Sequence, residues 1–137
     1  MNDFILNNGV KMPQVGFGTF LLQGEDCKNT VREAVSAGYR MIDTAEAYGN
    51  EDAVGDGIKE SGIDREELFL VTKVNFKSYE HTRETVKSSL RLLGTDYLDL
   101  VLLHWPFANY YAAWRDLEPL YEEGIIRAIG VSNFEPD

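Results

Sequence analysis

Four polar side chains suited to acid–base chemistry each close or follow an apolar run of the sequence. Asp43, Lys73 and His104 end such runs, and Tyr48 lies just after Asp43. A tyrosine beside an ammonium group donates its proton more readily, because the positive charge stabilises the phenolate that remains. An aspartate can keep that lysine charged and oriented, and a histidine can donate a hydrogen bond to a carbonyl oxygen. Together these residues suit the polarisation and protonation of a carbonyl group, with Tyr48 as the general acid.

Each residue also has an ordinary structural explanation when it is taken alone. Tyr48 and Lys73 can be surface or ion-pair residues, and His104 can be a core histidine whose hydrogen bonds are satisfied. Ser132 and Asn133 follow the last apolar run, where the local sequence favours a helix cap over a binding role. The chemical interpretation therefore depends on a fold that brings the separate residues together.

Strand-like runs alternate with amphipathic helical segments along the chain. Such alternation requires a parallel sheet covered by helices with right-handed crossovers, as in open doubly wound sheets and in barrels. The carboxyl ends of parallel strands share one edge, so the polar residues that close the strands are expected on one rim. The predicted strands are 15–20, 39–44, 68–74, 97–103 and 125–131, and the predicted helices begin at Asp26, Asn50, Ser78 and Tyr111.

Two local patterns near the N-terminus lead to specific expectations. Apolar residues on both sides of Asn7-Asn8-Gly9 predict a small hairpin, because these turn residues tolerate positive φ. Residues 15–20 are expected to form a first buried strand. Asn50 is expected to cap the helix that follows it, since asparagine is a favoured N-cap residue.

The last predicted helix contains a proline. Trp114, Leu117 and Tyr121 share one helical face and are expected to point inward. Pro119 is expected to kink the helix or divide it into two short segments, because proline lacks an N–H group and collides with the preceding turn.

Composition limits the class of protein and its partners. The chain has 137 residues with 44% apolar content, which fits one domain with a hydrophobic core. A formal charge of -10 argues against nucleic acid or an anionic membrane as a partner. Cys27 is the single cysteine, and the first three residues do not resemble a signal peptide, so a cytoplasmic protein is expected. His81 and His104 lack partners at metal-ligand spacings, so no metal site is expected.

Five motifs stand out along the chain: Gly16-Phe17-Gly18-Thr19, 41–51, Lys73, Leu103-His104-Trp105-Pro106 and 129–134. In order and spacing they resemble the aldo-keto reductase family, over essentially the whole chain. The resemblance implies an α/β fold of the (βα)8 TIM-barrel type. It also implies an oxidoreductase in which NADPH, or in some members NADH, gives a hydride to a small-molecule aldehyde or ketone.

The resemblance assigns roles that agree with the chemistry above. It makes Tyr48 the proton donor, Lys73 and Asp43 its electrostatic partners, and His104 the residue that orients the substrate carbonyl. Further residues are implied in binding: Gly18, Thr19 and Asp43 along the cofactor, Ser132 and Asn133 at the nicotinamide amide, and Phe20, Tyr48, His104 and Trp105 in the substrate pocket. The sequence departs from the family at Phe20, where many members carry tryptophan, and at Pro119.

Length is the larger departure from the family. A (βα)8 barrel needs about 250 residues. The chain is therefore expected to be a single N-terminal portion of such a barrel, with a capping hairpin in residues 1–14 and five βα repeats in 15–137. The adenosine clamp of the family lies beyond the fifth strand, so a truncated or half-barrel enzyme with impaired cofactor binding is expected.

Open barrel edges lead to two alternatives outside enzymatic function. The first and fifth strands would have unpaired edges, and the inner face would expose Val, Ile and Leu side chains, which favours self-association. One alternative is therefore a non-catalytic, self-associating half-barrel module. The other is a nucleotide-binding scaffold without chemistry.

Overall fold

The chain opens with the predicted hairpin. The computed structural model describes residues 3–136, so Met1, Asn2 and Asp137 lie outside the described residues. The prediction that the N-terminus is not a signal peptide rests partly on Met1 and Asn2 and therefore also lies outside them. Strands β1 (Phe4–Ile5) and β2 (Lys11–Met12) pair antiparallel. Gly9 has a φ of 86°, which glycine adopts without steric cost, and the Gly9 amide donates to the Leu6 carbonyl. The hairpin prediction is confirmed.

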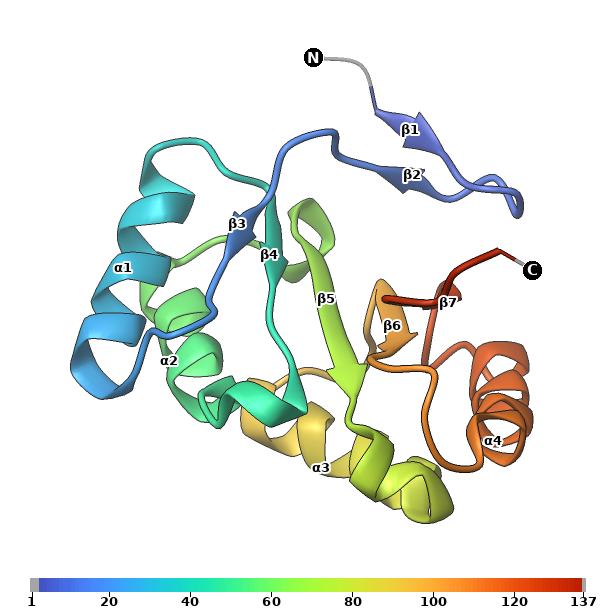
Figure 1. Ribbon diagram of the computed structural model, residues 1–137. Helices are drawn as coiled ribbons and strands as arrows, with labels where there is room; N and C mark the ends of the chain where they lie inside the picture. Colours follow the sequence, from blue (N-terminus) through green and yellow to red (C-terminus); the bar gives the residue numbers. More distant parts are fainter. Residues whose placement is uncertain (1–2, 137) are drawn as a thin grey trace.

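A five-stranded parallel sheet in the order β3-β4-β5-β6-β7 forms the centre of the fold. Figure 1 shows the four α-helices around the outer side of this curved sheet, with the hairpin across the amino ends of the strands. This is a partial (βα) barrel, as expected. The strands are β3 (Phe17–Gly18), β4 (Met41–Asp43), β5 (Phe69–Val74), β6 (Leu100–Leu103) and β7 (Ile129–Val131); the helices are α1 (Gly24–Ser36), α2 (Glu51–Ser61), α3 (Thr82–Leu93) and α4 (Tyr110–Glu122). Three 3₁₀ helices connect them: η1 (Glu46–Tyr48), η2 (Arg65–Glu67) and η3 (Phe76–His81).

Much of the inner face of the sheet is covered, contrary to the expectation of exposed apolar side chains, although Met41 and Leu102 stay half-buried. Val71 and Leu100 on this face are only 3% and 8% exposed. They form a cluster with Phe69 and Ala128, against which the hairpin residues Leu6, Val10 and Met12 pack. Curvature brings neighbouring inward side chains together and the hairpin closes over them, so burial here requires no second molecule.

The first strand is shorter and more exposed than predicted. Only Phe17 and Gly18 pair with β4, while Val15 is 48% exposed and Phe20 64% exposed. β3 is an edge strand with a neighbour on one side only, so the ladder ends as soon as the chain turns away from β4.

The structure corrects one predicted helix start and one predicted helix cap. The third helix begins at Thr82, because Ser78 lies in the preceding 3₁₀ turn of η3. Asn50 does occupy the N-cap position of α2, but its side chain makes no capping hydrogen bond. It turns instead into the protein interior.

Helix α4 runs without division through Pro119. Of the two expected outcomes, the division into two short segments is wrong, and the kink stays a prediction. Proline removes only its own N–H donor, and the residues on either side keep theirs. The buried residues of this helix are Ala113, Leu117 and Leu120, whereas Tyr121 is exposed. Of the predicted inward residues, only Leu117 is fully buried.

The glycines of α2 allow close contact between helices. A Cβ atom at Gly55 would lie 2.6 Å from the carbonyl oxygen of Leu92 on α3, and one at Gly57 would lie 2.6 Å from the carbonyl oxygen of Lys28 on α1. Both obstacles are backbone atoms, which cannot move aside as a side chain can. Glycine is a poor helix former, but at these two positions it is the residue that lets α2 pack closely between α1 and α3.

Candidate active site

The strand ends bring the four candidate catalytic residues to one edge of the sheet. Asp43 is the last residue of β4, Lys73 lies next to the end of β5, and His104 directly follows β6. The parallel registers β4 to β5 and β5 to β6 place these ends side by side. Tyr48 ends η1, in the loop that follows Asp43.

The Lys73 ammonium group is the centre of the site. This side chain is buried, and its Nζ donates to Asp43 Oδ1 at 2.6 Å and to the Thr44 carbonyl at 3.0 Å. The Tyr48 hydroxyl lies 3.5 Å from the same nitrogen. Each of the three N–H donors of the ammonium group thus has an acceptor, and the positive charge lies beside the Tyr48 phenol.

The His104 imidazole lies near the Tyr48 ring, at a centroid distance of 5.9 Å in an edge-to-face arrangement. Its Nδ1 is buried, and no group among residues 3–136 makes a hydrogen bond to it. Burial lowers the pKa of His104 below its usual value of 6.5; the Lys73 charge lowers it further, and Asp43 partly opposes both effects. The ring is therefore neutral at pH 7.

The lowered pKa makes the folded state sensitive to acid. Between the folded pKa of His104 and the ordinary value of 6.5, the unfolded chain binds more protons than the folded chain. We expect the free energy of unfolding to fall as the pH drops through this window, and to fall less in His104→Gln. Urea unfolding from pH 8 to pH 5 measures the two slopes, with His81→Gln as the control. Equal slopes for wild type and His104→Gln would contradict the assignment.

The residues expected along the cofactor lie at the same edge of the sheet but differ in their exposure to a bound molecule. A Cβ at Gly18 would meet no atom within 4 Å, so the space beside this residue is open. Thr19 is fully buried, and its hydroxyl donates to the Asp43 carbonyl at 3.1 Å. Its hydroxyl is thereby engaged within the protein.

The loop after β7 is tied to the histidine. Asn133 has a left-handed φ of 63°, and its Nδ2 donates to the His104 carbonyl at 3.0 Å and to Ser132 Oγ at 3.2 Å. Its Oδ1 remains as an acceptor at the rim. Residues 134–136 form no helix, but this stretch is too short to test the helix-cap interpretation of Ser132 and Asn133, which stays a prediction.

Aromatic rings border the site. Phe20 packs on Tyr48 at a centroid distance of 5.2 Å, and Trp105 stacks on His104 at 5.4 Å. Phe107, which the sequence did not suggest, stacks on Trp105 at 5.9 Å. The exposed faces of these rings form an apolar border next to the polar groups.

Two buried residues that support the site were also missed. The Tyr79 hydroxyl accepts from the Trp105 amide at 3.1 Å and donates to the Trp105 carbonyl, which holds the loop after His104. Glu51 is buried and accepts from the Thr72 hydroxyl at 2.7 Å; burial is the main cause that raises the pKa of Glu51. The motif 41–51 includes Glu51 without indicating its burial, and nothing local indicated Tyr79.

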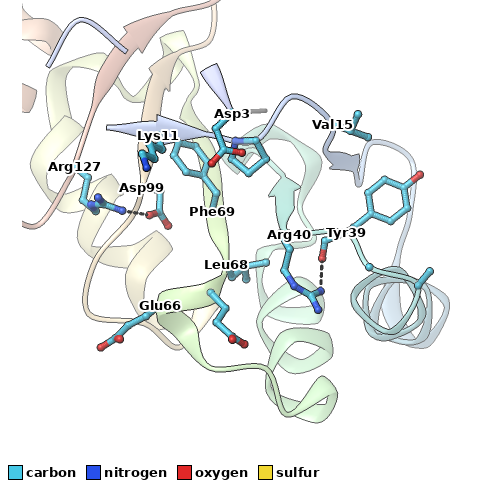
Figure 2. Close-up of a pocket in the computed structure, with 14 residues that line it drawn as sticks. Asp3, Lys11, Val15, Tyr39, Arg40, Glu66, Leu68, Phe69, Asp99 and Arg127 are labelled. Atoms are coloured by element: carbon cyan, nitrogen blue, oxygen red, sulfur yellow. Dashed lines mark hydrogen bonds and ion pairs between the residues drawn. The ribbon is translucent and has the colours of Figure 1, made fainter. Parts of the chain in front are cut away.

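A separate cavity of about 680 Å³ lies at the amino ends of the strands. Figure 2 shows Lys11, Arg40, Phe69 and Arg127 around it, with Arg127 paired to Asp99 at 3.0 Å. None of the four candidate catalytic residues lines this cavity. The buried Asp99 carboxylate also pairs with Arg65 and accepts from the Leu70 amide, which indicates a structural ion cluster at the same end of the sheet.

Other kinds of site find no support in the described residues. Within 3–136, no three His, Cys, Asp or Glu side chains are placed to hold a metal ion. In the same part of the chain, none of the helices has the length and apolar character needed to cross a membrane.

Residues 14–137 match the family model described as "Aldo/keto reductase family". Among curated proteins, the chain is 52% identical over 134 residues to the glyoxal reductase of Bacillus subtilis, covering 95% of this chain and 49% of that protein. It is 50% identical over 139 residues to the 9,11-endoperoxide prostaglandin H2 reductase of Trypanosoma cruzi, covering 98% of this chain and 49% of that protein.

Solved structures have the same fold over the same region. An aldo/keto reductase from Brucella melitensis superposes with a TM-score of 0.94 at 44% identity, covering 97% of this chain and 54% of that chain. A Bombyx mori aldo-keto reductase in complex with NADP has a TM-score of 0.88 at 36% identity, covering 96% and 50%. The chain spans about half the length of the curated relatives it matches.

Proposed function

Because the chain belongs to the aldo/keto reductase family, a family of carbonyl-reducing oxidoreductases, we propose that its site reduces aldehydes or ketones to alcohols with NADPH. The observation that carries this proposal is the position of Lys73 Nζ, which lies 2.6 Å from Asp43 Oδ1 and 3.5 Å from the Tyr48 hydroxyl. A phenol next to a fixed ammonium group is suited to donate a proton at neutral pH.

Each polar residue has one task in the proposed reaction. The Tyr48 hydroxyl gives its proton to the carbonyl oxygen as the carbonyl carbon accepts a hydride, and the product is an alcohol. Lys73 stabilises the phenolate that remains, and Asp43 keeps Lys73 oriented. The neutral His104 ring donates an N–H hydrogen bond to the same carbonyl oxygen, since its buried Nδ1 is best left unprotonated.

The residues at the rim fit the nicotinamide end of NADPH, or of NADH. The open space beside Gly18 admits a flat ring, and Asn133 Oδ1 and Ser132 can accept from a carboxamide. Asp43 would complete this side, whereas Thr19 is fully buried and would support it only through its hydrogen bond to the Asp43 carbonyl. When bound, NADPH supplies the hydride. Two relatives are named for different substrates, glyoxal and prostaglandin H2. In this chain, Phe20, Trp105 and Phe107 would contact the apolar part of a substrate.

The direct test of cofactor binding is a titration of the 137-residue chain with NADPH, followed by quenching of tryptophan fluorescence. We expect weak or undetectable binding, because the residues named above contact only the nicotinamide end. Micromolar or tighter affinity would contradict this expectation, and would indicate that the chain holds more of the cofactor than its nicotinamide. NADH, titrated in parallel, tests the preference between the two cofactors.

A second candidate function is self-association through the sheet edges. Within the described residues, β3 and β7 each pair with one neighbour only, and a groove of about 750 Å³ lies along β7. Leu102, Trp114 and Tyr121 are among its lining residues. As a non-catalytic module, the chain should sediment as a dimer or larger species without binding NADPH.

A cytoplasmic location is part of both proposals, since the single thiol of Cys27 is free and buried.

A further inference from the structure

Asn50 occupies the N-cap position of α2 without acting as a cap. Its side chain is 1% exposed and points into the protein. Nδ2 donates to the carbonyl oxygens of Thr19 at 2.8 Å and Leu22 at 2.9 Å, while Oδ1 accepts from the Thr44 hydroxyl at 2.8 Å. The opposite amide orientation would place Oδ1 against two carbonyl oxygens. Two separate segments, residues 19–22 and the loop that begins at Thr44, therefore meet on one buried amide at the start of α2.

One of these segments is a strained turn. The Leu22 amide donates to the Thr19 carbonyl at 3.1 Å, which closes a four-residue turn. Its third residue, Leu21, has a φ of 71° and is 78% exposed. A branched residue in the left-handed region is unfavourable and persists only where the surroundings hold it. The two bonds from Asn50 are at the two ends of this turn.

The segments joined by Asn50 carry the proposed proton donor and its neighbours. The turn bears Phe20, whose ring packs on Tyr48 at 5.2 Å. Thr44 accepts from Lys73 Nζ through its carbonyl at 3.0 Å. Gln23 Nε2, just after the turn, donates to the Tyr48 carbonyl at 2.8 Å and forms a second link between the two loops.

We propose that Asn50 is a positioning residue that holds the 19–22 turn, and thereby keeps Phe20 against Tyr48. Asn50 contacts none of the groups assigned to proton transfer. It acts through the turn, because loss of its two donors leaves the left-handed Leu21 supported by fewer bonds. The consequence for catalysis rests on the proposed function, whereas the consequence for the turn does not.

The first test compares two asparagines at helix N-cap positions. In Asn50→Asp, a carboxylate faces two carbonyl oxygens and has no hydrogen to donate. The matched control is Asn109→Asp at the start of α4, where Asn109 Oδ1 accepts from the Ala112 amide and aspartate can do the same. Chymotrypsin cleavage after Phe20 or Leu21 reports opening of the turn. We expect at least about tenfold faster cleavage in Asn50→Asp, since loss of one buried hydrogen bond alone has roughly this effect and two are lost, and unchanged cleavage in Asn109→Asp.

The second test separates positioning from general support. If Asn50 acts through Phe20, then Asn50→Ala alone lowers kcat/KM for an aldehyde. The same substitution made in a chain that already carries Phe20→Ala should have little further effect. Additive effects would overturn the proposal, and so would equal cleavage of Asn50→Asp and Asn109→Asp. Where Asn50→Asp does not fold, Thr44→Val frees the amide more gently and should still speed cleavage at the turn; unchanged cleavage would again overturn the proposal. A chain without carbonyl reduction refutes the proposed function alone, since the cleavage comparison needs no activity.

Discussion

Tyr48→Phe is expected to lower NADPH-dependent aldehyde reduction by about 10³-fold, the usual range for loss of a general acid. The change removes one hydroxyl, which lies 3.5 Å from Lys73 Nζ. Ring packing against Phe20 and His104 needs no hydroxyl and should persist. The fold and its stability should therefore be unchanged while the reaction is lost. NADPH oxidation at 340 nm with a simple aldehyde measures the rate, and circular dichroism measures the fold.

The matched control for this substitution is Tyr111→Phe, which makes the same chemical change on an exposed ring of α4 that stacks on Tyr110. Its activity should equal that of wild type. Full activity in Tyr48→Phe would exclude Tyr48 as the acid. A nucleotide-binding scaffold without catalytic activity would give a different result. NADPH binding would survive Tyr48→Phe, and the wild-type chain would show no turnover.

Lys73→Met is expected to separate catalysis from stability. Methionine has a similar length and no charge, so the phenolate that forms at Tyr48 would lose its neighbouring cation. We expect a loss of about 10²-fold or more in kcat, because the charge acts as the reaction proceeds. Asp43 would keep contact with water, since its side chain is 39% exposed. The free energy of unfolding should therefore fall by no more than about 1 kcal/mol, because the larger penalty for removing one partner of a buried ion pair applies when the remaining charge has no contact with water.

The control for this prediction is Lys77→Met, which removes a lysine charge from an exposed position in η3. It should leave both kcat and stability near the wild-type values. Urea unfolding and steady-state kinetics measure the two quantities on the same samples. A Lys73→Met chain that is strongly destabilised would assign Lys73 mainly to the structure, and one that retains kcat would remove it from the proposed chemistry.

The alternation of elements and the strand ends could be predicted because both are written locally in the chain. Apolar runs such as 68–74 give buried strands wherever helices cover them, and parallel pairing then places residues like Asp43 and His104 on one edge. The turn chemistry of Asn7-Asn8-Gly9 is equally local, and the hairpin follows from it. Gly55 and Gly57 could be identified from the sequence only as a loss of helix propensity, since their backbone contacts come from other helices.

The sequence by itself determined the order of elements, the parallel sheet and the set of polar residues at the strand ends, because these depend on residue type and short-range periodicity. The tertiary structure alone decided which partner each polar group finds. Asn50 has the local pattern of a cap, yet two carbonyls and a hydroxyl from other segments outcompete the helix for its amide. The Thr19 hydroxyl likewise turns inward to Asp43. A hydrogen bond depends on atoms being within about 3 Å, and only the folded chain sets such distances between residues far apart in sequence.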